Sequence, residues 1–399
     1  MKSHSVRWRL RSSWMIAPAA ALMLVTAACS SEGSSTSGGP EQATVVGLIE
    51  IKGDSPNALN DYNNGAQMAV DAINRAGGVL GKPMDYRRIP ASVTDPQAAR
   101  TAFLKAVDEN PSAIIGFPGG GSLEALTRDV DSAAIPMIHI SSDGKLARGA
   151  EAGSEWLFSV NPDDTARATN AVSLASKLGG KRIGIVATDE TFGRVSAENS
   201  IAAIEAAGLE LGTVRYVPPT VTDLTGTILD LRDSDVILSW TFPNVLALQL
   251  NQMAQNAIDT PVITGNSGPL VTAGNLADEN ARRPLHAVTP CAPAIGDSAA
   301  GRTFAADYQA RFGATPTASA TQVYDSVRLL AAAMESAGTV SDHDAIADSL
   351  RAIEWDQGAC AAMYRSDGAQ FLGHQTVAEA FAGPGTIVDR YDVAPSDER

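Results

Sequence analysis

The chain has 399 residues, of which 44% are hydrophobic and 19% charged. This composition excludes a disordered chain and a polytopic membrane protein, and the length suits two lobes of ordinary size. Aspartate and glutamate outnumber lysine and arginine by 15, and an acidic surface repels phosphate backbones, so we expect no nucleic-acid partner.

Residues 1–28 are predicted to be an export signal. Basic residues precede an apolar run from Trp14 to Ala28, which is too short to span a membrane as a mature helix. The run ends in the sequence TAAC, which resembles the lipobox of bacterial lipoproteins, so we expect Cys29 to be the lipidated mature N-terminus. Residues 29–43 are rich in Ser and Gly and are predicted to be a flexible tether. Cleavage after Ala28 without lipidation stays open, because Thr26 stands where a lipobox prefers an aliphatic residue.

From residue 44 the sequence alternates short apolar runs with longer segments of helical period. This pattern is typical of βαβ units around a parallel sheet. In the first half we expect strands at 44–51, 84–89, 113–117 and 135–140. The same rhythm restarts after residue 160, with strands expected at 182–187, 211–217, 235–240, 261–264 and 285–290. Three further helices are expected at 298–312, 319–336 and 342–353.

The cysteines predict one disulfide. If Cys29 carries a lipid, Cys291 and Cys360 remain as an even pair in an oxidising compartment. Two separate buried thiols are the alternative.

No catalytic or metal-binding pattern occurs in the sequence. The five histidines are scattered, without a pair at metal-ligand spacing. No dinucleotide fingerprint or nucleophile elbow follows a predicted strand. We therefore expect no enzyme activity, no metal and no cofactor.

A run of three glycines followed by Ser122 lies between a predicted strand and a predicted helix. Glycines let a ligand approach the backbone, and a helix start offers N–H groups and partial positive charge to a carboxylate. Gly120, Gly121 and Ser122 are therefore candidate ligand contacts. A loop in which Ser122 simply caps the helix is the alternative.

Further candidates follow neighbouring strands, at the edge where open parallel sheets bind their ligands. In the first lobe these candidates are Ser141, Ser142 and Asp143. In the second lobe they are the aromatic residues Phe192, Trp240 and Phe242. Ordinary core packing is the alternative for each ring.

Five segments of the chain resemble type I periplasmic binding proteins of the Leu/Ile/Val-binding class: NGAQMAVDAINRAGGVLGKP, AIIGFPGGGS, PMIHISSDG, RIGIVATDETFG and VYDSVRLLAAAME. The resemblance covers residues 43–393. It implies an α/β fold of two doubly wound parallel-sheet lobes joined by three crossovers. Lobe 1 would comprise 44–160 plus 290–353, lobe 2 would comprise 161–289 plus 354–393, and 394–399 would form a tail.

The resemblance also implies roles for individual residues. The family binds the carboxylate of its ligand at the loops matching 120–122 and 141–143, and covers the ligand with rings at the positions of Phe192 and Phe242. Amino-acid binders of this class place an acid for the ligand ammonium where this chain has Asn266. Asp143 replaces a residue that is usually small or hydroxylated, so the identity of the solute stays open.

By this resemblance the protein is expected to be the receptor of an ABC importer. It would be a monomer, anchored to the outer face of the cell membrane, which closes around a small polar solute and docks on an ABC permease. A ligand sensor of the same fold, reporting to a membrane signalling partner, is the alternative. An exported enzyme on this scaffold is disfavoured by the missing catalytic residues.

Overall fold

The structure is a computed structural model that describes residues 42–48, 56–92, 95–116, 120–147, 154–296, 298–361, 364–366, 371–372, 375–382 and 385–392. The predicted signal, Cys29 and the tail 394–399 lie outside the described residues. Among the residues that it describes, no helix combines the length and apolarity needed to cross a membrane.

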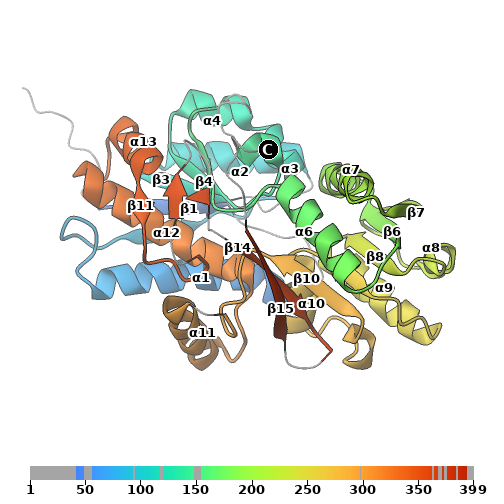
Figure 1. The fold of residues 1–399 in the computed structure, drawn as a ribbon. Coiled ribbons are helices and arrows are strands. Elements are labelled where there is room, and N and C mark those ends of the chain that lie inside the picture. The colour runs from blue at the N-terminus through green and yellow to red at the C-terminus, as the bar shows by residue number, and fades with distance from the viewer. Residues whose placement is uncertain are drawn as a thin grey trace, which may run out of the picture. The chain divides into compact units, whose positions relative to one another are not determined.

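The first sheet has five parallel strands in the order β2-β1-β3-β4-β5 (Figure 1). The strands are β1 (Thr44–Leu48), β2 (Asp85–Arg88), β3 (Ala113–Gly116), β4 (Met137–His139) and β5 (Leu157–Ser159). They alternate with α1 (Pro56–Arg75), α2 (Pro96–Asp108), α3 (Gly120–Glu124), α4 (Thr127–Ala133) and α5 (Gly144–Ala147). Successive residues of β1 pack into different cores, since Val45 belongs to one cluster and Val46 to another. Both faces of this strand are therefore buried, which explains its continuous apolar run.

The second sheet has seven strands in the order β15-β14-β10-β9-β8-β6-β7. Five are parallel to one another: β6 (Arg182–Thr188), β7 (Glu210–Val217), β8 (Val236–Trp240), β9 (Val262–Thr264) and β10 (Leu285–Thr289). The other two, β14 (Gln375–Ala380) and β15 (Thr386–Asp392), extend the sheet as an antiparallel hairpin beside β10. The accompanying helices are α6 (Asp164–Lys177), α7 (Thr191–Ala206), α8 (Thr225–Leu231), α9 (Pro243–Gln255), α10 (Ser267–Ala273) and the short η2 (Asn280–Arg282).

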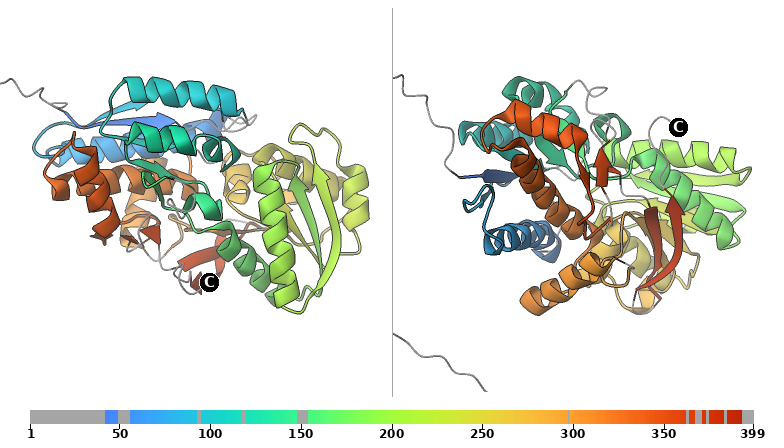
Figure 2. Two further views of the ribbon diagram at one scale, coloured as in Figure 1. Left: turned by 90° about the horizontal axis from the view of Figure 1, so that it is seen from above. Right: turned by 60° about the vertical axis from the view of Figure 1, so that its left-hand side comes forward.

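Three later helices return to the first sheet: α11 (Ala299–Phe312), α12 (Ala318–Ala337) and α13 (His343–Ala352). Figures 1 and 2 show the orange helix α12 beside the blue helix α1. The contact between α1 and α12 requires a glycine, because a Cβ atom at Gly65 would lie 2.2 Å from the carbonyl oxygen of Ala320. The doubly wound architecture predicted from the sequence is confirmed.

The segment after α13 departs from the predicted lobe boundaries. It forms a small antiparallel sheet of β11 (Glu354–Trp355), β12 (Tyr364–Ser366) and β13 (Phe371–Leu372). Its aromatic side chains belong to the core of the first sheet, where the rings of Phe158 and Phe371 lie 6.0 Å apart. Assigning all of 354–393 to the second lobe was therefore wrong, because only β14 and β15 join the second sheet.

The chain segments that pass between the sheets are tied together covalently and by hydrogen bonds. Cys291, just after β10, forms a disulfide with Cys360, with 5.2 Å between the Cα atoms, as the cysteine count predicted. The fully buried carboxylate of Asp325 in α12 accepts hydrogen bonds from the backbone N–H groups of Ala359 and Cys360, at 2.9 and 2.8 Å, and from the hydroxyl of Tyr364 at 3.0 Å. These bonds fix the return path of the chain.

We expect the double variant Cys291→Ala/Cys360→Ala to unfold more easily than the wild type. The disulfide closes a loop with a sequence separation of 69, for which chain entropy predicts a stabilisation of up to about 4 kcal/mol. Urea unfolding with and without a reductant measures the effect. The reductant should lower the unfolding midpoint of the wild type and leave that of the double variant unchanged, and two titratable thiols in the unreduced wild type would contradict the prediction.

Candidate ligand-binding site at the carboxyl ends of the strands

The two polar loops of the first lobe meet at one edge of the first sheet. Gly120, Gly121 and Ser122 lie in α3, which follows β3 and contacts α5, the helix that begins after the 141–143 loop. Ser122 is 1% exposed, and its Oγ has no hydrogen-bond partner among the described residues. The hydroxyl therefore does not cap the helix. A buried hydroxyl left unpaired costs about 1–3 kcal/mol, which a ligand acceptor would relieve.

The loop after β4 uses part of its polarity internally. Asp143 Oδ1 accepts hydrogen bonds from the backbone N–H groups of Lys145 and Leu146, at 2.9 and 3.3 Å, and thereby caps α5. Ser141 Oγ accepts from the N–H of Asp143 at 3.3 Å. The Asp143 side chain thus already stabilises the start of α5.

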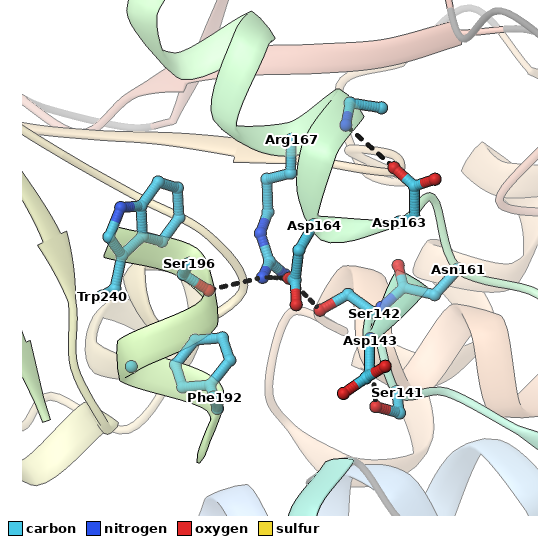
Figure 3. A network of polar contacts seen from close by, with 12 residues as sticks. Ser141, Ser142, Asp143, Asn161, Asp163, Asp164, Arg167, Phe192, Ser196 and Trp240 are labelled. Carbon is cyan, nitrogen blue, oxygen red and sulfur yellow. Dashed lines mark hydrogen bonds and ion pairs between the residues drawn. The ribbon is translucent and has the colours of Figure 1, made fainter. Parts of the chain in front are cut away.

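Ser142 connects this loop to a buried ion pair (Figure 3). Its hydroxyl donates to Asp164 Oδ1 at 2.7 Å, and Arg167 Nη2 donates to the same oxygen and, at 3.3 Å, to Ser196 Oγ. Ser142 belongs to the first lobe, whereas Asp164 and Arg167 lie in α6 and Ser196 lies in α7. One polar network therefore joins the loop of the first sheet to two helices of the second.

Burial determines the electrostatics of this pair. Burial raises the pKa of Asp164 to about 6, although Arg167 and the Ser142 hydroxyl both favour its charged form. Arg167 is only 8% exposed, and its Nε has no partner within the described part of the chain. The guanidinium therefore keeps one buried donor available.

Aromatic rings pack against Arg167 from the second lobe. Its guanidinium carbon lies 5.4 Å from the ring centre of Phe192 and 5.3 Å from that of Trp240, distances at which a cation is attracted to the ring face. Figure 3 shows these rings on one side of Arg167, and the 141–143 loop on the other. Phe192 also stacks on Phe242, with 6.1 Å between ring centres. Trp240 is 1% exposed, donates from Nε1 to Ser200 at 2.8 Å and belongs to the core.

Asn266 links the second lobe to α12. Its Nδ2 donates to Ser319 Oγ at 3.2 Å, and its buried Oδ1 has no partner among the described residues. The preceding residue, Gly265, lies near the ion pair, because a Cβ atom built on it would lie 3.2 Å from Cδ of Arg167.

Comparison with known proteins decides the family. A family model described as "Periplasmic binding protein" matches residues 43–381. The chain belongs to this family. Within it, the chain is 25% identical over 272 residues to Leu/Ile/Val-binding protein homolog 8 of Brucella abortus, a match that covers 65% of this chain and 63% of the relative, less than two thirds of its length. It is 23% identical to Leu/Ile/Val-binding protein BraC3 of Rhizobium johnstonii, over 77% of this chain and 82% of that protein.

Solved structures of the family share the fold at low sequence identity. Leucine-binding protein LivK of Thermotoga maritima superposes with a TM-score of 0.77 at 18% identity, over 89% of this chain and 99% of that one. LivJ of Streptococcus pneumoniae, in complex with isoleucine, superposes with a TM-score of 0.75 at 20% identity. The match covers 89% of this chain and 100% of LivJ. A solute-binding protein of an ABC transporter from Rhodopseudomonas palustris, in complex with 3,4-dihydroxybenzoic acid, superposes with a TM-score of 0.78 at 15% identity. The match covers 90% of this chain and 99% of that protein. The family match confirms the expected class, a periplasmic binding protein, and these structures confirm the expected fold.

The sequence analysis missed the charged centre of the site. Asp164 and Arg167 are spaced one helical turn apart at the start of α6, a pattern that on its own indicates a solvated helix face. It also missed Gln322 of α12, whose Nε2 donates to Asn161 Oδ1 and to the carbonyl of Val160, both at 3.0 Å. The sequence signal that could have found the ion pair was its place in the chain, because Asp164 directly follows the first predicted crossover between the lobes.

We expect Arg167→Met to destabilise the protein more at pH 8 than at pH 5. Removing one partner of a buried ion pair costs about 3–5 kcal/mol, and here it leaves the carboxylate of Asp164 without its cation. The folded-state pKa of about 6 already exceeds the ordinary value of 3.8, so the contribution of Asp164 to stability is largest at low pH and is lost as pH rises through 6. Without Arg167 this pKa rises further, and the deficit grows with pH.

Thermal unfolding of both proteins between pH 5 and pH 8 measures this difference. The double variant Arg167→Met/Asp164→Asn is the control. It has no carboxylate at position 164, so its deficit relative to the wild type should not grow as pH rises. A deficit of Arg167→Met that stays constant across this range would show that Asp164 does not respond to Arg167.

Proposed function

We propose that the protein is the extracytoplasmic solute-binding receptor of an ABC importer, and that it binds a small carboxylate between the ends of the two sheets. The observation that carries the proposal is a pair of buried donors without a hydrogen-bond partner among the described residues: Ser122 Oγ in the first lobe and Arg167 Nε in the second. Both can donate to an anionic ligand. Family membership supports the role, and isoleucine and 3,4-dihydroxybenzoic acid, the ligands of two structural neighbours, both contain a carboxyl group.

The two lobes approach each other at this place. A Cβ atom at Gly121 in α3 would lie 3.1 Å from Thr191 Oγ1, at the start of α7. Phe192 is the next residue of α7, and its ring stacks on Phe242. A ligand held by Ser122 and covered by these rings would contact both lobes, which is how hinge closure around a solute is driven in this kind of protein.

The acidic residues around the site argue against a ligand ammonium. Asp164 is paired with Arg167, and Asp143 caps α5. Glu190 caps α7 by accepting from the N–H groups of Phe192 and Gly193, at 3.0 and 2.8 Å. Asn266 is neutral. With these carboxylates engaged, the site favours a carboxylate without an ammonium group, such as a 2-oxo acid or an aromatic acid, over a zwitterionic amino acid.

We expect Ser122→Ala to weaken binding of the preferred carboxylate. The variant loses one charge-assisted hydrogen bond, worth about 1.5–3 kcal/mol, or about ten- to hundredfold in Kd. Benzoate, 4-methyl-2-oxopentanoate and L-leucine are first ranked by thermal shift, because a ligand at a hundredfold excess over Kd stabilises the protein by about 2.7 kcal/mol. Calorimetry on the best ligand then compares the wild type with Ser122→Ala.

The matched control is Ser132→Ala, an exposed serine of α4 whose hydroxyl donates to the carbonyl of Arg128. The affinity of this variant should equal that of the wild type. Unchanged affinity in Ser122→Ala would remove Ser122 from the site. Leucine binding tighter than that of both other acids would show that the site does accommodate an ammonium group.

The proposal includes export and anchoring through Cys29, which the sequence pattern supports. We expect Cys29→Ala to release the protein from the membrane fraction into the extracytoplasmic fluid or the medium. Fractionation of cells that express either form measures this. Equal membrane partitioning of the two forms would contradict lipidation. The proposal also includes the partner: the receptor, as a monomer, binds an ABC permease in the same membrane.

A further inference from the structure

A cavity of about 840 Å³ is lined by residues other than those of the candidate site. Its walls come from α1, α10, the 292–295 segment, the connection between α11 and α12, and the β14–β15 hairpin. Elements packed on both sheets therefore contribute to it. Within the described part of the chain, none of the candidate ligand residues lines this cavity. Its size falls in the range of small-molecule sites.

The lining of the cavity combines carboxylates with apolar and aromatic groups. Asp61 and Glu379 are the acidic members, at 5% and 7% exposure. Tyr308, Phe312 and Phe381 supply aromatic rings. Among the described lining residues there is no lysine, arginine or histidine, so the only titratable groups facing the cavity are the two acids and Tyr308. The cavity is therefore negative when these acids are ionised.

Each carboxylate is held in place without a cation. Asp61 accepts hydrogen bonds from Tyr308 at 2.7 Å and from the hydroxyl of Thr317. Glu379 Oε1 accepts from Thr289 Oγ1 at 2.9 Å. No basic side chain contributes to the environment of either acid in the described structure. Both acids therefore lack a basic neighbour among the described lining residues.

We propose that this cavity is a second ligand site, which takes a small organic cation whose charge lies against Asp61 and Glu379 and whose apolar part packs on the aromatic rings. A buried carboxylate without a cation is costly, so a cationic ligand gains both the charge interaction and the relief of that cost. Aromatic faces add attraction for the same charge. The proposal is independent of the solute bound at the candidate site.

The pH dependence of binding follows from the state of the acids. Burial raises the pKa of Asp61 to about 6 and that of Glu379 to about 7. A permanently charged probe such as benzyltrimethylammonium cannot titrate, so any change in its affinity reports on the protein. Only the ionised carboxylates attract it, and we expect its Kd to increase about tenfold or more between pH 8 and pH 5.5.

Calorimetry with benzyltrimethylammonium tests the proposal on the wild type and three variants. Glu379→Gln should weaken binding at pH 8 by about tenfold or more, with Glu205→Gln, an exposed glutamate at the far end of α7, as the matched control that keeps wild-type affinity. Ala273→Trp should abolish binding by filling the cavity, and it does so without altering either carboxylate. Absence of binding at pH 8, affinity that does not change with pH, or wild-type affinity in Glu379→Gln or in Ala273→Trp would overturn the proposal.

Discussion

The candidate site depends on the burial of the ion pair between Asp164 and Arg167. A charged pair away from water is tolerated only where further hydrogen bonds satisfy its remaining atoms. Here Ser142 supplies such a bond from the first lobe and Ser196 supplies one from the second. The pair therefore specifies how the 141–143 loop, α6 and α7 meet. It also leaves Arg167 Nε, beside two aromatic rings, without a partner in the described part of the chain. The same contact that orders the structure therefore leaves a donor for a ligand.

Local patterns in the sequence were sufficient to predict the two sheets, because a buried parallel strand is a short apolar run between turn residues wherever it occurs. The lobe to which a segment belongs is not local information. The alternation of residues in the segment 354–372 is compatible with packing on either sheet. Its position is decided by Trp355, Tyr364 and Phe371, which complete a core already formed by α12 and the first sheet. That choice depends on residues far away in the sequence and could not be predicted from the segment itself.

The same distinction applies to the site. Glycines and serines after a strand carry a local meaning, so the 120–122 and 141–143 segments were found, and α3 and α5 do lie in contact. Charged residues at the start of a helix resemble a solvated face until the structure buries them, which is why Asp164 and Arg167 were missed. Aromatic residues at strand ends divide into two kinds. Phe192 lies against Arg167 and stacks on Phe242. The ring of Trp240 also lies against Arg167, but Trp240 is held in the core by its bond to Ser200. Only packing separates the two kinds.

The two parts of the molecule that we assign to ligands have opposite polarity for a common physical reason. At the candidate site the described acids are engaged and donors remain, which favours an anion. In the cavity, acids remain and basic groups are absent from the described lining, which favours a cation.

Burial raises the pKa of Asp61, Asp164 and Asp325 to about 6 and that of Glu379 to about 7, in spite of the hydrogen bonds that each accepts. An acid whose folded-state pKa is raised stabilises the fold most at low pH, and this contribution is lost as pH rises through that pKa. The interior thus bears its largest electrostatic cost near neutral pH, where a cation in the cavity would offset part of it. The cavity is lined by elements packed on both sheets. A cation in the cavity that favoured one arrangement of the lobes would therefore alter the affinity of the candidate site for its solute. By linkage, the solute would alter the affinity of the cavity for the cation by the same factor.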